Sequence, residues 1–171
     1  MDDALNLETY RDVLCRLYGF WRGWEPQVSA LMRDEAFLEP RRRLHLLTAD
    51  LAALGLSADA RDALPLCPLT PLADDMEALG SMYVLEGSTL GGRVIQRNIH
   101  RCLGDEGRGS CTYFHGYGQD TGLMWRLFMA RLDDAPPVDA GRIGRGASAT
   151  FERVGSWLLN QPTPAGVLRG H

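Results

Sequence analysis

The stretch YVLEGSTLGGRVI, residues 83–95, brings small residues together where a flat ligand could lie against a helix backbone. Gly87 and Gly91 are four residues apart and so share one helix face, which Ser88 and Gly92 widen. Each glycine inside a helix costs about 0.5–1 kcal/mol relative to alanine, so a compensating contact is expected. That contact is either a ligand on the bare backbone or a closely crossing second helix.

Other chemistry-bearing residues show no recognised spacing. The Glu-x-x-His pairs of a di-iron bundle, an HExxH motif, a GxSxG motif and a phosphate-binding GxxxxGK loop are all absent. The cysteines form no CxxC pair, which favours reduced structural thiols. The histidines are His45, His100, His115 and His171, and we expect surface or capping roles for them.

Composition predicts one globular domain. The chain has 171 residues, of which 45% are hydrophobic and 23% charged, and its net charge is -4. This charge does not favour nucleic acid or anionic membranes, although all 18 basic residues are arginine. No signal peptide or membrane-spanning run is found, so we expect a cytoplasmic protein that binds neither nucleic acid nor membrane. The domain is predicted to cover residues 1–160 and a loose tail residues 161–171.

Hydrophobic periodicity predicts an all-α fold, since no segment alternates with period two. Asn6 caps a first helix that is expected to end near Pro26, and a second, over 41–54, starts with the solvated cluster Arg41–Arg43 and stops at Gly55. A short connector precedes a long helix that Thr70 and Pro71 begin and Gly104 ends, and this helix contains the glycines.

Two more helices follow a glycine-rich loop over 104–118. They are predicted over 120–132, where Leu123, Leu127 and Leu132 form the apolar face, and over 138–160.

Five segments in order carry a resemblance that covers nearly the whole chain. They are LETYRDVLCRLYGFWRGWEP, DLAALG, LGSMYVLEGSTLGGRVI, YFHGYGQDTGLMWRLF and ATFERVGSWL. Together they resemble the bacterial heme oxygenases associated with bacteriophytochromes. The resemblance implies a single helical domain that holds heme between a proximal and a distal helix and cleaves it to biliverdin, CO and ferrous iron.

The resemblance also implies which residues form the site. The distal helix would place Gly87, Ser88, Gly91 and Gly92 over the heme, with Gly87 and Ser88 positioning water and O2. Arg126 matches a basic position that meets a propionate, and Phe151 matches an aromatic that contacts the ring edge. Heme would be both substrate and cofactor, O2 the oxidant, and a ferredoxin- or reductase-type protein the external electron donor. A bilin-accepting phytochrome would be a further partner.

One part of the family pattern has no match. The family's proximal histidine lies on a helix that would precede Met1, so the metal ligand is unknown; His45 and His100 are candidate substitutes. Three alternatives follow: an enzyme with a misassigned start or another ligand, a non-catalytic heme- or bilin-binding relative, and a purely structural helical protein. Without that helix, aromatic side chains near the start of the chain would either be exposed and form a homodimer contact or pack into the core. These residues are Tyr10, Tyr18, Phe20, Trp21, Trp24 and Phe37.

Overall fold

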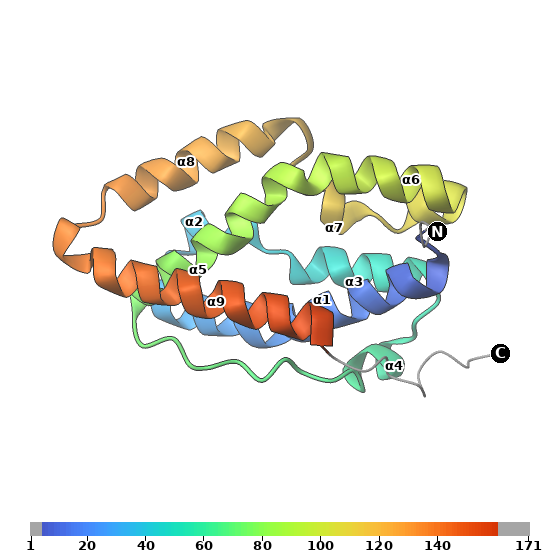
Figure 1. The fold of residues 1–171 in the computed structure, drawn as a ribbon, viewed down its shortest axis with the longest axis horizontal. Coiled ribbons are helices and arrows are strands. Elements are labelled where there is room, and N and C mark those ends of the chain that lie inside the picture. Colours follow the sequence, from blue (N-terminus) through green and yellow to red (C-terminus); the bar gives the residue numbers. More distant parts are fainter. Residues whose placement is uncertain (1–4, 161–171) are drawn as a thin grey trace.

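The computed structural model describes residues 5–160, and within them it contains helices and connections but no strand (Figure 1). The predicted all-α class is therefore confirmed, whereas the predicted tail, residues 161–171, lies outside the described residues. The long helices are α1 (Leu7–Met32), α5 (Asp75–Ser88), α6 (Gly92–Gly109), α8 (Thr121–Asp133) and α9 (Ala140–Asn160). The shorter elements are α2 (Glu35–Leu38), η1 (Glu39–Arg41), α3 (Leu44–Ala53), α4 (Ala58–Asp62), η2 (Thr89–Gly91), α7 (Thr112–His115), η3 (Gly118–Asp120) and η4 (Pro137–Asp139).

Helix α1 runs beside α9, and α5 rises from that level to α6 (Figure 1). Asn6 caps α1 as predicted, because its side-chain oxygen accepts a hydrogen bond from the Thr9 N–H at 2.8 Å. The predicted end near Pro26 is wrong, since α1 continues to Met32. Burial of Val28 beyond the proline helps to offset the backbone hydrogen bond that Pro26 cannot make.

The aromatic residues of α1 are buried, as are its neighbouring aliphatic residues. Tyr10, Phe20, Trp21 and Trp24 all belong to the hydrophobic core, and the rings of Trp21 and Trp24 meet edge to face at 4.9 Å. These side chains therefore form the core of one chain and offer no exposed aromatic surface for a second copy. The homodimer stays a prediction that these residues do not support.

The predicted single helix over 71–103 is wrong at both ends and in its middle. It begins at Asp75, because Asp74 is the N-cap and accepts from the N–H groups of Met76 and Glu77. The 3-10 turn η2 then separates α5 from α6. Helix α6 continues to Gly109 with a kink at Gly104, whose positive φ of 59° favours glycine. The predicted loop over 104–118 is largely helical, because it contains the end of α6, α7 and the start of η3.

Helices α5 and α9 cross more closely than side chains would allow. An added Cβ at Gly80 would lie 1.9 Å from the Ile143 carbonyl oxygen, and one at Gly146 would lie 1.9 Å from the Glu77 carbonyl oxygen. Both glycines are buried, and each therefore lets the facing backbone come near. The close crossing that the sequence offered as an explanation for Gly87 and Gly91 is thus made by other glycines.

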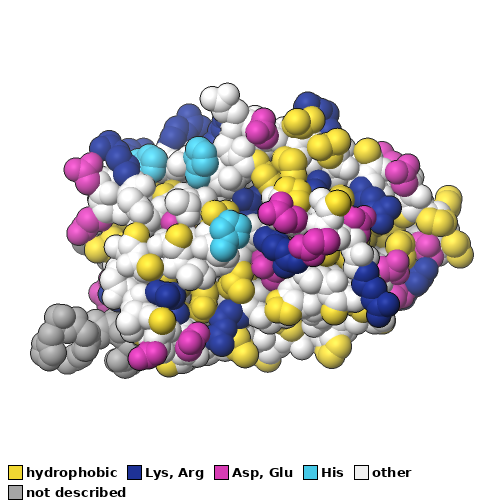
Figure 2. All heavy atoms as spheres, turned by 180° about the vertical axis from the view of Figure 1, so that it is seen from behind, with side chains coloured by type: hydrophobic (Ala, Val, Ile, Leu, Met, Phe, Trp, Pro, Cys, Tyr) yellow, Lys and Arg dark blue, Asp and Glu magenta, His cyan; other side chains and the backbone are white. Residues whose placement is uncertain are grey.

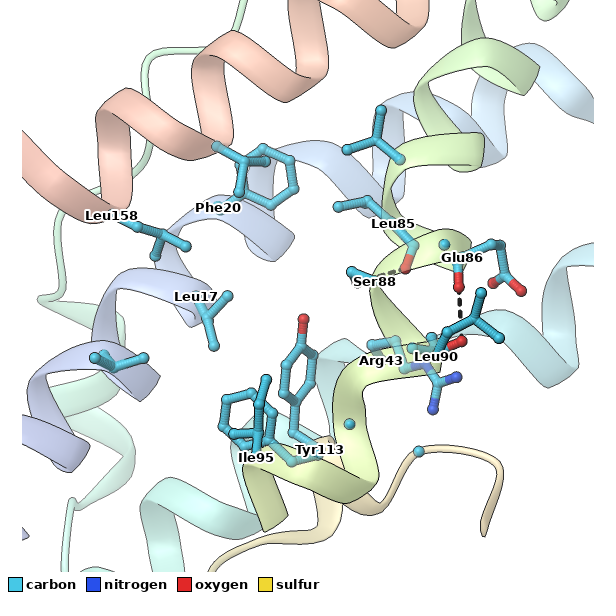
Figure 3. A pocket seen from close by; sticks show the side chains of 18 of the residues that line it. Leu17, Phe20, Arg43, Leu85, Glu86, Ser88, Leu90, Ile95, Tyr113 and Leu158 are labelled. Atoms are coloured by element: carbon cyan, nitrogen blue, oxygen red, sulfur yellow. Dashed lines mark hydrogen bonds between the residues drawn. The ribbon is translucent and has the colours of Figure 1, made fainter. Parts of the chain in front are cut away.

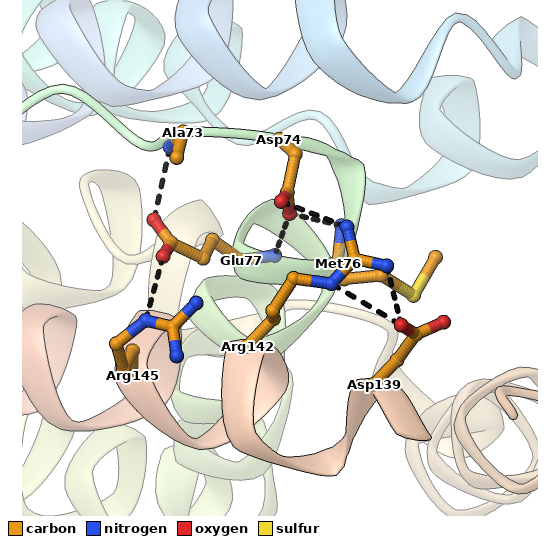
Figure 4. A network of polar contacts seen from close by, with 7 residues as sticks. All are labelled: Ala73, Asp74, Met76, Glu77, Asp139, Arg142 and Arg145. Atoms are coloured by element: carbon orange, nitrogen blue, oxygen red, sulfur yellow. Dashed lines mark hydrogen bonds and ion pairs between the residues drawn. The ribbon is translucent and has the colours of Figure 1, made fainter. Parts of the chain in front are cut away.

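A polar network ties the start of α5 to the start of α9 beside this crossing (Figure 4). Arg142 of α9 pairs with Asp74 at 2.9 Å and also with Asp139, while Arg145 pairs with Glu77 at 3.0 Å. The backbone N–H of Glu77 and the Arg142 guanidinium hold the pKa of Asp74 below its ordinary value, because both interact with its ionised form.

The second predicted helix is wrong at its start. The chain makes the turn η1 first, and α3 begins only at Leu44; Gly55, with φ 83°, follows its end as predicted. The cluster expected to be solvated is largely buried, since Arg41 is 6% exposed and Arg43 is 4% exposed. Each guanidinium lies over an aromatic ring. That of Arg41 lies 4.1 Å from the centroid of the Phe37 ring.

Helix α8 forms where it was predicted, but with a different buried face. Leu123 and Leu127 are 47% and 52% exposed, so the expectation that they pack inward is wrong. Phe128 is fully buried instead, and its ring stacks at 6.0 Å on that of Trp125. The aromatic rings remove more apolar area from water than the leucines would.

The surface opposite that of Figure 1 mixes basic and acidic side chains, with histidines among them (Figure 2). Over residues 5–160, no helix has both the length and the apolar character that a membrane crossing requires.

Candidate functional site

A cavity of about 910 Å³ lies between α1, the α5–η2–α6 segment, α7 and α9. Figure 3 shows Leu17, Phe20 and Leu158 on one side of this space and Leu85 and Ser88 on the other. Most of the lining is aliphatic or aromatic. Its size is at the upper end of the range of about 300–1,000 Å³ that small-molecule sites occupy, so the cavity suits a large apolar ligand.

The glycine-rich segment supplies one wall of the cavity. A Cβ added at Gly87 would meet only the Trp125 ring, at 3.7 Å, so no helix backbone contacts this glycine. Gly92 also lines the cavity and packs against the Phe114 carbonyl oxygen, which an added Cβ would approach to 2.5 Å. Gly91 is exposed, has nothing within 4 Å of its Cβ position and is not part of the lining.

Hydroxyl groups in this wall are bonded to their own helix. Ser88 donates to the Leu85 carbonyl oxygen at 2.6 Å, and Thr89 donates to the Glu86 carbonyl oxygen at 2.6 Å. Such bonds compete with the α-helical pattern, which agrees with the change to a 3-10 turn at Thr89. The Ser88 oxygen lines the cavity as an acceptor, while its proton is already used.

A buried ionic cluster adjoins this wall, and two of its members, Glu86 and Arg43, belong to the lining. Glu86 accepts a hydrogen bond from the Tyr117 hydroxyl at 2.7 Å and lies 3.7 Å from Arg41, while the Arg43 guanidinium lies 3.9 Å over the Tyr117 ring. Burial raises the pKa of Glu86, although the Tyr117 hydrogen bond and Arg41 act in the other direction. The cluster joins α5 to η1 and to the segment after α7, and so fixes the backbone next to Gly87.

The wall formed by α7 presents Tyr113. Asp50 of α3 is fully buried and accepts from the Thr112 and Tyr113 N–H groups at 2.8 and 2.9 Å, which holds the start of α7 in place. The Tyr113 hydroxyl accepts a hydrogen bond from the Trp21 indole N–H at 3.1 Å. Figure 3 shows this hydroxyl directed toward the space between Leu17 and Ser88. Burial raises the pKa of Tyr113, so the phenol keeps its proton.

The remaining predicted site residues lie at or beyond the edge of the cavity. Phe151 of α9 contributes to the lining although it is 71% exposed. Arg126 follows the lining residue Trp125 on α8 but is exposed and is not itself part of the lining. Within residues 5–160, no acidic side chain forms an ion pair with Arg126.

None of the histidines within residues 5–160 lines the cavity. His45 of α3 and His115 of α7 are exposed, His100 of α6 is half-buried, and His171 lies outside the described residues. No group of three or more His, Cys, Asp or Glu side chains that could hold a metal ion occurs in the described part of the chain. The candidate substitute ligands His45 and His100 therefore lie outside the cavity lining.

Sequence reasoning missed Tyr113, Trp21 and Asp50 as parts of the site. Tyr113 stands in the YFHGYG segment, yet its contact with Trp21 joins residues 92 positions apart. Asp50 follows an apolar helical pattern that carries no sign of a distant backbone partner. Trp125 could have been found more easily, because it directly precedes the predicted site residue Arg126 and lies on the same helical face as Phe128.

Comparison with known proteins gives one informative match. A curated protein named heme oxygenase, from Xanthomonas campestris pv. campestris (strain 8004), is 30% identical over 164 residues, which cover 94% of each chain. No protein-family profile matches the sequence.

Proposed function

The chain belongs to the heme oxygenase family, and on that basis we propose that it binds heme in the cavity beside Gly87 and oxidises it. The products would be biliverdin, CO and ferrous iron, formed with O2 and electrons from a ferredoxin- or reductase-type donor. The apolar cavity of about 910 Å³ with a bare glycine in its wall is the observation that carries this proposal.

The lining fits the ring of heme. A flat macrocycle needs a face without projecting side chains, and at Gly87 only the Trp125 ring lies within 4 Å of the Cβ position. Leu17, Phe20 and Leu158 would contact the apolar faces and edge of the ring. Heme itself supplies a redox-active iron, whereas the chain supplies orientation, an apolar environment and control of water.

Polar contacts are proposed at the edges of the ring. Arg126 has no ion-pair partner within residues 5–160 and lies on the exposed surface of α8 next to Trp125, where it would pair with a propionate carboxylate. Phe151, at the cavity edge, would contact the rim of the ring. Ser88 offers an acceptor to a water molecule, because its proton is bonded to Leu85. Gly87 would leave room for that water and for O2.

A second candidate function is non-catalytic binding of heme or a bilin. The observation that favours it is the lack of a histidine in the cavity lining within residues 5–160. Binding of an apolar tetrapyrrole needs only the cavity, whereas turnover also needs iron held in a reactive state. The two candidates therefore predict the same binding but different chemistry.

Hemin titration followed by absorption spectroscopy tests the binding that both candidates share. Gly87→Leu would place a side chain in the cavity and is expected to weaken hemin binding at least tenfold. Gly91→Leu is the matched control, because its Cβ position is open and outside the lining, and it should bind as the natural protein does. Equal weakening by both variants, or no hemin binding by the natural protein, would contradict the proposal.

Turnover separates the two candidates. The hemin complex is supplied with O2, a reductase and electrons, and biliverdin is measured by its absorption spectrum. Biliverdin formation supports the enzyme. Stable hemin binding without biliverdin, under conditions where a known heme oxygenase is active, supports the non-catalytic relative.

A further inference from the structure

Resting on the proposed function, we propose that the Tyr113 hydroxyl donates a hydrogen bond to a carbonyl oxygen of a linear tetrapyrrole in the cavity. Tyr113 would thereby favour the open-chain product over the closed macrocycle. The inference depends on how this side chain is held, on which donors of the cavity are free, and on the polar atoms that the two ligands carry.

Tyr113 is held at both ends. Its backbone N–H donates to the buried Asp50 carboxylate at 2.9 Å, and its phenol oxygen accepts from the Trp21 N–H at 3.1 Å. Its ring also meets those of Trp21 and Phe114 edge to face, with centroids 6.2 and 5.1 Å apart. A donor fixed in this way loses little conformational freedom when a ligand binds.

The Tyr113 proton is not used within the described structure. The phenol oxygen accepts from Trp21, and no atom within residues 5–160 accepts the hydroxyl hydrogen. Three other cavity hydroxyls donate to backbone carbonyl oxygens: Tyr10 to Ser110, Ser88 to Leu85 and Thr89 to Glu86. Tyr83 also lines the cavity, but it is 41% exposed. Since the Tyr113 hydroxyl also points into the cavity (Figure 3), it is a neutral interior donor that a ligand would meet, whereas Arg43, which lines the cavity as well, is a charged one.

The two tetrapyrroles differ in what they offer this donor. The edge of the closed heme ring is hydrocarbon apart from its propionates, whereas ring opening leaves a carbonyl oxygen at each cut end. A neutral phenol among apolar side chains can satisfy a neutral carbonyl, but it does not compensate for the desolvation of a carboxylate. The neutral phenol therefore matches the carbonyl of the open chain, whereas a propionate matches a guanidinium or the exposed surface.

Equilibrium binding of biliverdin and of hemin tests this selectivity on the full chain. Tyr113→Phe keeps the ring and removes only the hydroxyl, so biliverdin is expected to bind about fivefold to tenfold more weakly. Hemin is expected to lose clearly less affinity than biliverdin, and the biliverdin absorption band should shift because the carbonyl loses its partner. Tyr18→Phe is the matched control, since Tyr18 also lies on a core helix but outside the lining.

A second variant tests the hydrogen bond that holds the Tyr113 hydroxyl in place. Trp21→Phe removes the N–H that fixes the Tyr113 oxygen while keeping an aromatic ring, and it should weaken biliverdin more than hemin. Unchanged biliverdin affinity in Tyr113→Phe, or equal weakening of both ligands, would overturn the inference; hemin binding by the natural protein would then still support the proposed function. If the natural protein binds neither ligand, both proposals fail.

Discussion

The crossing of α5 and α9 gives the sharpest test of what holds the cavity together. In Gly80→Ala and Gly146→Ala, the new Cβ would lie 1.9 Å from a backbone oxygen, whereas real Cβ contacts are essentially never under 3.0 Å. The helices must therefore separate by more than 1 Å, because a backbone carbonyl cannot rotate away as a flexible side chain can. Overpacking costs about 1–3 kcal/mol, and a shift of two backbones belongs at the upper end of that range.

Helix propensity acts in the opposite direction and sets the control. Alanine is favoured over glycine in a helix by about 1 kcal/mol, so each crossing variant should lose about 1–2 kcal/mol of unfolding free energy. Gly144→Ala on the same helix has nothing within 4 Å of the new Cβ and is expected to gain about 0.5–1 kcal/mol. Urea unfolding followed by far-ultraviolet circular dichroism measures these values. Stability gains of equal size in all three variants would refute the close crossing.

Two further predictions follow from titratable groups. The pKa of Asp74 is lower in the folded protein than its value of about 4 in the unfolded chain. The carboxylate therefore stabilises the fold at a pH above about 4, and this effect is lost as the pH falls through the folded pKa. The difference in unfolding free energy between the natural protein and Asp74→Asn should thus become smaller on acidification. A pH-independent gap in urea midpoints would count against this. Cys102 is exposed, whereas burial raises the pKa of the other thiols to about 11, so alkylation at neutral pH should add one label to the native protein. Mass spectrometry of the intact protein checks this, and rapid labelling of a second cysteine would contradict it.

Local sequence patterns predicted where helices form more accurately than where each helix begins and ends. Asn6 at the start of α1 and Gly55 after α3 act within their own segments, and both behave as predicted. Pro26 does not end α1, because tertiary burial of the residues after it outweighs the lost backbone bond. A cap or breaker in the sequence states a local preference, and the core decides whether it is followed.

Buried charge was the property least visible in the sequence. Three adjacent arginines are typical of a solvated surface, but Arg41 and Arg43 are buried because Phe37, Glu86 and Tyr117 surround them. Two of those partners come from segments far along the chain, so no window around the arginines contains them. The spacing of the glycines, in contrast, singled out this segment but left open a ligand or a helix crossing. Gly87 lines the cavity, whereas Gly91 does not.

Glycine has two separate roles on α5, and the distance between them links stability to the cavity. Gly80 lets α9 approach, and Gly87, seven residues and about two helical turns later, faces the cavity. Helix α9 also supplies Leu158 and Phe151 to the lining, so the crossing at Gly80 fixes the separation of two cavity walls. Spacing the same helices further apart would widen the cavity without changing any lining residue. The glycines at the crossing are therefore structural in their contacts, yet they set the width of the space that the proposed ligand would occupy.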